Sequence, residues 1–408
     1  MKKRVVITGW GLITPFGVGV ENNWNKLLQE KSCIKTLSTV NTSNLRVKIG
    51  GEIPKINFLD HLPGIRPRRL DESVLLTLLA SKEAIQHAKL TEKECKETGM
   101  ILGTCFGTIK TKEDTFLRLA EDESSIYALI FLKGMDNAAA NETAIRFKLK
   151  GINQTIFTAC SASLMAIGNA YRQISDGHEK RIITGGVDSA ITKSVMKGWE
   201  KLHVISFCKE PDSASRPFSK NRDGLVMSEG AGFVVLEEYE TAIKRKATIY
   251  GEIAGFGTNC DATHITSPDV ESQSAAMHLA LKDAGVSPSQ IQYINAHGTA
   301  TTFNDKAETQ AFKNVFGEYA YKIPVSATKS QIGHTMGACG AIEMILTLLM
   351  MKHKTLLPTL HFEGNDPDCD LDYVPNKIRK VNSVDYALKT SFGFGGSNAV
   401  VVLKNEFS

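Results

Sequence analysis

The chain has 408 residues and a formal net charge of +4, and 42% of its residues are hydrophobic while 23% are charged. This length and apolar share allow a large buried core in one or two closely packed domains. The charge is too small to indicate nucleic-acid binding, and no basic tail or alternation of basic and aromatic residues favours it. We therefore expect a globular protein that does not bind nucleic acid.

The sequence also indicates a cytoplasmic protein without membrane, metal or cofactor. The eight cysteines show no CxxC pair and no Cys/His metal spacing, which is typical of reduced thiols. The apolar N-terminal stretch is interrupted by Gly9, Gly11, Pro15 and Gly17, which predicts a strand and a loop rather than a signal peptide. The run Ile342–Met351 predicts an apolar helix that is too short to cross a membrane.

Cys160 is the first candidate catalytic residue. The apolar, β-branched segment Thr155–Thr158 predicts a buried strand, and Ser161–Ile174 has the apolar spacing of a helix. Cys160 then lies at a helix N-terminus, where free backbone N–H groups and the helix dipole lower a thiol pKa. A buried structural cysteine is the alternative, because free cysteines are usually inert.

Strand and helix patterns alternate along the whole chain, which predicts an α/β fold with two similar halves. The charged helix expected at Glu238–Lys246 separates a strand at Gly232–Leu236 from another at Ile249–Ile253. No flexible Pro- or Ser-rich linker lies there. We therefore place the boundary between residues 1–246 and 247–408, and we expect the halves to pack as one body with an active site between them.

Two histidines lie on glycine-containing turns in the second half. His297 follows the expected strand Ile291–Ile294, and His334 precedes the small-residue segment that opens the apolar helix. A single histidine at such a turn is more often structural than catalytic. Two of them downstream of Cys160 favour a catalytic set, and each is expected at the end of a strand, where open α/β folds bind ligands.

Lys329 and Glu343 complete this set. A buried lysine needs a partner for its charge, and Glu343 follows Lys329 at a distance that allows an ion pair. We expect Lys329 to organise the electrostatics of the site rather than to transfer protons.

These residues belong to segments through which the chain resembles the β-ketoacyl-acyl-carrier-protein synthases of the elongating type, in the thiolase superfamily. A cysteine with two histidines is similar to the elongating synthases, while initiating synthases use His and Asn and thiolases use a second Cys. The resemblance implies a thiolase-like, duplicated α-β-α-β-α layered fold. The matching segments run almost end to end: Arg4–Gly9, Thr158–Ala162, Ser215–Phe218, Arg222–Gly224, Asn295–Thr299, Lys329–His334 and Ser391–Asn398.

The resemblance implies a decarboxylative Claisen condensation between an acyl group on Cys160 and a malonyl-acyl-carrier protein. The backbone N–H groups of Cys160 and Phe394 are then the oxyanion hole, and Phe394 is a mobile gate over the thiol. His297 and His334 donate hydrogen bonds to the malonyl-derived enolate.

Hydroxyl groups in two loops are candidates for binding the pantetheine arm. The resemblance assigns this role to Thr266, Ser267, Thr299 and Thr301, with Phe394 beside them. Ordinary turn chemistry is the alternative for serine and threonine.

The dense cationic run Arg66, Arg68 and Arg69 is a candidate landing site for an acidic carrier protein. A solvated loop without a partner is the alternative. The other expected partner is a second subunit, in a homodimer or in a heterodimer with a related synthase-like chain.

Several positions depart from the family pattern. Ser161–Ser163 replaces a segment that more often contains Gly, Thr302–Asn304 replaces a Pro-containing turn, and Cys339 stands where Ala is commoner. The segment Phe106–Asn137 also differs. A ketosynthase of polyene or polyketide assembly, paired with a chain-length-factor-like subunit, therefore stays an alternative to fatty-acid elongation, as do a non-catalytic partner and a cysteine hydrolase.

Overall fold

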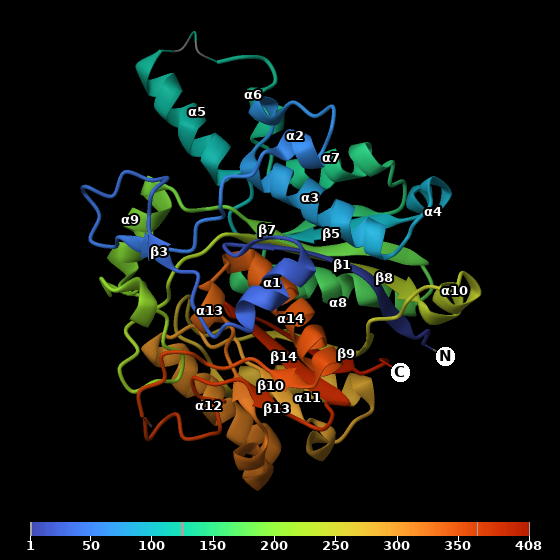
Figure 1. Ribbon diagram of the computed structural model, residues 1–408, viewed down its shortest axis with the longest axis vertical. Helices are drawn as coiled ribbons and strands as arrows, with labels where there is room; N and C mark the ends of the chain where they lie inside the picture. Colours follow the sequence, from blue (N-terminus) through green and yellow to red (C-terminus); the bar gives the residue numbers. More distant parts are fainter. Residues whose placement is uncertain (1, 123, 125, 365, 408) are drawn as a thin grey trace.

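A computed structural model describes residues 2–122, 124, 126–364 and 366–407 (Figure 1). Within these residues, eleven strands form one mixed sheet in the order β11-β10-β14-β15-β9-β1-β8-β7-β5-β6, with β2 beside β1. The strands are β1 (Val5–Thr14), β2 (Gly17–Val18), β5 (Gly99–Gly103), β6 (Asn153–Ile156), β7 (Arg181–Asp188), β8 (Gly230–Glu238), β9 (Glu252–Cys260), β10 (Tyr293–Asn295), β11 (Val325–Ser326), β14 (Tyr386–Gly393) and β15 (Ser397–Lys404).

The strand order is the same in both halves when it is followed outward from the centre. One half runs β1-β8-β7-β5-β6 and the other runs β9-β15-β14-β10-β11, so each half places its strands in the order first, fifth, fourth, second, third. A short antiparallel contact between β1 and β9, at Val5 and Ile253, joins the two. The expected duplicated α/β fold is therefore confirmed.

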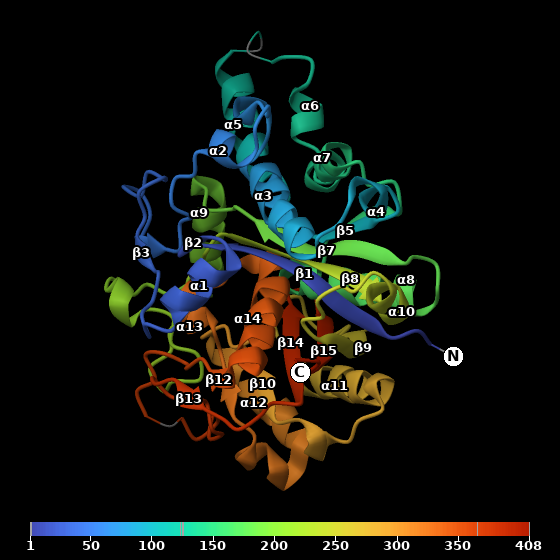
Figure 2. The same ribbon diagram turned by 45° about the vertical axis from the view of Figure 1, so that its right-hand side comes forward.

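Helices lie in three layers around these strands (Figure 2). The central helices α8 and α14 contact each other and strands of both halves, α3 and α7 cover the first half, and α11 and α12 cover the second. The main helices are α3 (Glu72–His87), α7 (Ala138–Phe147), α8 (Ala162–Ser175), α11 (Val270–Ala284), α12 (Thr302–Phe316) and α14 (Cys339–His353).

Shorter elements connect and cover these layers. They are the helices α1 (Val20–Leu27), α2 (Phe58–His61), α4 (Glu92–Lys96), α5 (Ile109–Glu121), α6 (Ile130–Lys133), α9 (Lys193–Leu202), α10 (Tyr239–Lys244) and α13 (Lys329–Ile332), and the strands β3 (Lys35–Thr36), β4 (Ile49–Gly50), β12 (Thr355–Leu356) and β13 (Arg379–Lys380).

The apolar helix expected at Ile342–Met351 is longer than predicted. Helix α14 and the turn before it form an 18-residue segment, Met336–His353, with a mean hydropathy of 1.2, which meets the length and composition of a membrane span. In the folded protein 89% of this segment is buried. It is apolar on all sides because it packs between the strands of the two halves.

Strand β1 does not break where the sequence predicts a loop. It continues through Gly9 and Gly11 to Thr14. The two glycines serve helix packing rather than a turn, because α3 lies so close to the strand that these positions have no room for a side chain. A Cβ atom would lie 2.2 Å from the Ala84 carbonyl oxygen at Gly9 and 2.0 Å from the Ala80 carbonyl oxygen at Gly11.

Two further strand predictions need correction. β6 is an exposed or half-exposed edge strand rather than a buried one, since it pairs only with β5 within the described residues. The strand predicted at Ile249–Ile253 begins later, at Glu252, because Gly251 has a φ of +144°. The predicted helix after Cys160 and the strand within β8 are confirmed.

Candidate active site

The turn that carries Cys160 is a single 3₁₀ turn, Ala159–Ser161, between β6 and α8. Ala159 has a φ of +48°, a left-handed conformation that costs a non-glycine residue about 1 to 3 kcal/mol. The Cys160 carbonyl oxygen accepts hydrogen bonds from Ser391 Oγ at 3.0 Å and from Cys339 Sγ at 3.2 Å. These contacts with the second half hold the strained turn in place.

Cys160 is 7% exposed, and burial raises the pKa of its thiol above the ordinary value. The nearby Lys329 charge acts in the opposite direction. The sequence predicts a lowered thiol pKa from the helix N-terminus, but loss of solvent around the sulfur is the larger effect here. The resting site therefore holds the protonated thiol.

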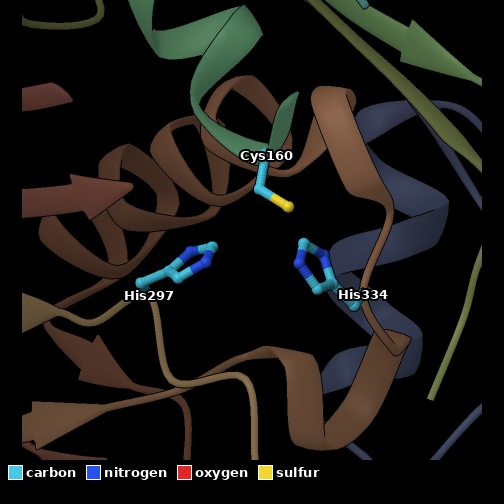
Figure 3. Close-up of side chains that lie close together, drawn as sticks. All are labelled: Cys160, His297 and His334. Atoms are coloured by element: carbon cyan, nitrogen blue, oxygen red, sulfur yellow. The ribbon is translucent and has the colours of Figure 1, made fainter. Parts of the chain in front are cut away.

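His297 and His334 face this thiol from opposite sides (Figure 3). The Cys160 sulfur and a nitrogen of each histidine lie within 4.8 Å of one another, and the imidazole centroids are 5.4 Å apart. His297 follows β10 as expected. His334 is not at a strand end, because α13 lies between it and β11, and its backbone instead pairs with residues 226–228.

Neighbouring groups fix the tautomer of both imidazoles. Lys329 Nζ lies 3.5 Å from His297 Nδ1, and the Met336 backbone N–H donates to His334 Nδ1 at 3.2 Å. The Met336 amide only donates, so His334 Nδ1 accepts and its Nε2 carries the proton. The Lys329 protons have closer acceptors on Glu343 and the His297 carbonyl, but the positive charge beside His297 Nδ1 favours a lone pair there and the proton on Nε2. His334 Nε2 is buried without a partner among the described residues.

The pKa of each imidazole lies well below its ordinary value because burial disfavours the cation, and the Lys329 and Lys389 charges add to this effect. Both rings are therefore neutral Nε2–H donors. A Cys/His/His set of this size resembles a zinc ligand set. Zinc needs an imidazole lone pair, however, and coordination through Nε2 would require a proton on each Nδ1, which the Lys329 charge and the Met336 N–H disfavour. This arrangement fits hydrogen-bond donation better than metal binding.

Lys329 and Glu343 form the expected ion pair, with Lys329 Nζ 2.7 Å from Glu343 Oε1. Lys329 also donates to the His297 carbonyl oxygen at 2.5 Å. Burial opposes the Lys329 charge, but Glu343, together with Cys339 and Glu308, raises the Lys329 pKa.

A second buried lysine, which the sequence analysis missed, completes this cluster. Lys389 on β14 is fully buried, and its Nζ lies 2.5 Å from Glu343 Oε2 and 3.2 Å from the Ala296 carbonyl oxygen. Burial lowers the Lys389 pKa, and the Lys329 charge adds to this. One carboxylate therefore contacts two lysines directly behind His297. The only sequence signal was a single lysine in an apolar strand.

Two buried carboxylates that were also missed hold the active-site loops. Glu308 on α12 accepts from the backbone N–H groups of His297 and Gly298 and from the Thr390 hydroxyl. Asp188, at the end of β7, accepts from the Thr104 hydroxyl and from three backbone N–H groups, those of residues 105, 106 and 337. Burial raises the Asp188 pKa to about 6.

The remaining expected substrate residues line one cavity that reaches Cys160, His297 and His334. These residues are Thr266, Ser267, Thr299, Thr301 and Phe394. Phe394 contacts the Trp199 ring with centroids 5.7 Å apart. A Cβ atom at Gly393 would lie 2.7 Å from the Thr158 carbonyl oxygen, so only glycine lets this loop lie against the Cys160 turn.

Arg66, Arg68 and Arg69 do not line this cavity; all three are exposed around the 3₁₀ turn Pro67–Arg69. None of the three side chains forms an ion pair with another described residue. Lys133 and Arg146 line a neighbouring groove together with Arg66 and Arg69. The predicted cationic surface is thus larger than the run itself.

Comparisons with known proteins identify the family of the chain. Residues 2–242 match the beta-ketoacyl synthase N-terminal domain, and residues 250–363 match the C-terminal domain. The chain is 41% identical over 409 residues to 3-oxoacyl-[acyl-carrier-protein] synthase 2 of Synechocystis, covering 99% of this chain and 98% of that protein. It is 38% identical over 407 residues to the protein of that name from Staphylococcus aureus, with 98% of each covered.

Solved structures show the same relationship. The ishigamide ketosynthase/chain length factor superposes with a TM-score of 0.94 at 29% identity, covering all of both chains. A beta-ketoacyl synthase from Burkholderia phymatum gives a TM-score of 0.92 at 31% identity, with 99% of this chain and 100% of that chain covered. With its thiolase-like fold, its Cys/His/His site and matches to both domains, the chain belongs to the beta-ketoacyl synthase family.

Proposed function

We propose that this protein is an acyltransferase that condenses an acyl group held on Cys160 with malonyl-acyl-carrier protein, as in fatty-acid chain elongation. The observation that carries the proposal is the pair of neutral imidazoles, each fixed as an Nε2–H donor beside the same thiol. Hydrolysis at a cysteine also begins with attack by the thiol, but it needs no second site that donates hydrogen bonds to an enolate. Here two such donors face the substrate.

In the first step Cys160 Sγ attacks the carbonyl carbon of an acyl-carrier thioester. The new C–S bond forms, the carrier C–S bond breaks, and the thiol proton leaves with the carrier sulfur. The N–H groups of Cys160 and Phe394 stabilise the tetrahedral oxyanion in this proposal, and closure of Phe394 over the thiol excludes water.

In the second step the malonyl group loses carbon dioxide. The electron pair of the breaking C–C bond becomes an enolate, whose oxygen accepts hydrogen bonds from His297 and His334. The enolate carbon then attacks the acyl-Cys160 carbonyl, and as the C–C bond forms the Cys160 sulfur leaves as a thiolate, which takes up one proton from solvent to restore the resting thiol. Lys329, held by Glu343, keeps the His297 proton on Nε2 throughout. The hydroxyls of residues 266, 267, 299 and 301 bind the pantetheine arm.

The proposed partners are an acyl carrier protein and a second synthase subunit. A related solved structure is of a type II PKS acyl-carrier protein in complex with its ketosynthase. The exposed arginines Arg66, Arg68 and Arg69 provide a surface of the right charge for an acidic carrier. The outer edge of β6, with Phe157 at 47% exposure beside it, favours a dimer, because an exposed strand edge recruits a partner.

The proposal includes the division into residues 1–246 and 247–408. The mirrored strand order and the position of α10 just before this boundary support it. We also place the enzyme in the cytoplasm, a location that suits its eight free thiols.

A polyene or polyketide ketosynthase is a second candidate. The observation in its favour is the TM-score of 0.94 to the ishigamide ketosynthase/chain length factor, over the full length of both chains. Such an enzyme would be active only as a heterodimer with a related subunit, whereas a fatty-acid synthase of this type would be active as a homodimer.

The test is incubation of the purified protein with acyl-carrier and malonyl-carrier protein, followed by mass spectrometry of both the carrier and Cys160. We expect an acyl adduct on Cys160, release of carbon dioxide and a β-ketoacyl-carrier product. Free acid alone would identify a hydrolase. Product that forms only after a chain-length-factor-like subunit is added would favour the second candidate, and the absence of any adduct would overturn both.

A further inference from the structure

Gln273 is an unusual residue in the wall of the active-site cavity. It lies in the first turns of α11, and its side chain is fully buried. Neither its amide oxygen nor its amide nitrogen has a hydrogen-bond partner among the described residues. It lines the same cavity as Cys160 and His334.

Two other polar residues of the same cavity wall, Asp261 and Asn398, are already hydrogen-bonded to each other. Asn398 Nδ2 donates to Asn259 Oδ1 at 3.0 Å and to Asp261 Oδ1 at 2.6 Å. The other Asp261 oxygen accepts from the Asp269 backbone N–H at 3.2 Å. Gln273 therefore takes no part in this hydrogen-bond network.

Among the described cavity-lining residues, buried polar atoms without partners occur only on His334 and Gln273. The His334 atom is the Nε2–H donor proposed to bind the enolate. Gln273 differs because both a donor and an acceptor are left unpaired on one planar group. A buried amide in this state destabilises the fold, so a role in binding is a reason for its presence.

We propose that Gln273 is a recognition residue for a secondary amide of the substrate arm. Its N–H and C=O groups are complementary to the C=O and N–H of such an amide. This inference rests on the proposed function, because substrates delivered by a carrier protein arrive on a pantetheine arm that contains two amides. Gln273 thus complements the hydroxyls of Thr266 and Thr299 in the same cavity.

The variant Gln273→Leu tests this role with three thioesters of the same acyl group. These are the acyl-pantetheine, which has both amides, the acyl-N-acetylcysteamine, which has only the amide nearest the sulfur, and a simple alkyl thioester, which has none. We expect the variant to raise KM for acyl-pantetheine about tenfold, the factor that about 1.4 kcal/mol gives, with kcat nearly unchanged. KM for the alkyl thioester should not change. The N-acetylcysteamine result then shows which amide is bound.

The same variant should raise the Tm, because leucine removes two unpaired polar atoms from a buried position. A purely structural glutamine would instead lower the Tm when it is replaced. Ser274→Ala is the matched control, since Ser274 lies on the same helix, donates to the Val270 carbonyl oxygen and does not line the cavity.

Equal KM changes for all three thioesters, or an unchanged KM with acyl-pantetheine, would overturn the inference. Failure of the wild-type protein to acylate Cys160 from any thioester would instead contradict the proposed function. The two results are distinguishable because the wild-type adduct is measured by intact mass before the variants are compared.

Discussion

The two halves of the molecule share a strand order but have different chemistry at equivalent strand ends. The third strand of the first half, β6, leads into the turn of Cys160, while the third strand of the second half, β11, leads to Lys329. The second strands, β5 and β10, lead to Thr104 and to His297. The fold thus determines where side chains meet, and the residues at each strand end determine what they do.

The buried charges next to Cys160 and His297 also differ between the halves. Lys329, Glu343 and Lys389 form one contact group in the second half, directly behind His297. Next to the Cys160 turn, the first half contributes Asp188, which accepts hydrogen bonds and forms no ion pair among the described residues. We infer a division of labour in which the first half holds the acyl group and the second half activates malonyl.

The largest expected effect separates these two tasks. Cys160→Ala should abolish condensation, because no acyl-enzyme forms, but should leave malonyl decarboxylation measurable, since the histidines stay in place. Release of labelled carbon dioxide and formation of the β-ketoacyl product are measured in parallel. A folded variant that has lost both activities would show that the halves do not act separately.

Replacement of either histidine tests the other half. His297→Ala and His334→Ala should each reduce decarboxylation about a hundredfold or more, the usual cost of losing one preorganised oxyanion donor. Acylation of Cys160, measured by intact mass, should be less affected. Decarboxylation near the wild-type rate in one variant would remove that histidine from the enolate site.

Lys389→Met tests whether the second buried lysine has an electrostatic role. Lys389 is one of the charges that lower the pKa values of His297 and His334, so without it both imidazoles should become protonated at a higher pH, and decarboxylation should be lost at a higher pH on acidification. Decarboxylation should fall about tenfold.

Lys404→Met is the control for this experiment, because Lys404 lies on the neighbouring strand β15 and is partly exposed, with Glu406 as its partner. If Lys389 is only structural, its variant will have a lower Tm but an unchanged pH profile of decarboxylation.

The cationic surface of the first half should have a smaller effect. Replacement of Arg66, Arg68 and Arg69 with Ala should raise KM for acyl-carrier protein about fivefold and reduce its salt dependence, because long-range attraction of an acidic partner is lost. Acyl-pantetheine should react as before. Unchanged use of both substrates would indicate that the run is a solvated loop and that docking depends on other basic residues, such as Lys201 or Lys220.

The sequence predicts the parts of the site that follow local patterns. Cys160 and His297 lie at strand ends with small residues, and the Lys329–Glu343 pair follows from the need to neutralise a buried lysine. Lys389 and Glu308 were not predicted, because their partners are distant in the chain. The same limit applies to the thiol pKa, since a helix terminus is visible in a sequence but the loss of solvent around Cys160 depends on tertiary packing.

The smallest expected effect concerns pH, and it distinguishes the second half from the surface of the protein. Burial and the lysine charges hold the pKa values of His297 and His334 well below 6.5, so both rings should stay neutral as the pH falls from about 8 to about 6. A histidine with the ordinary pKa of about 6.5 would be mostly protonated at the lower pH. In selectively labelled protein, the ring signals of these two residues should therefore shift little over this range, while those of free histidine in the same buffer serve as the reference. Because the protonation of these two rings does not change, the rate of decarboxylation by the Cys160→Ala variant should change less than about twofold between about pH 8 and about pH 6. A ring signal of His297 or His334 that titrates near pH 6.5 would show that the lysine cluster does not keep the donors neutral.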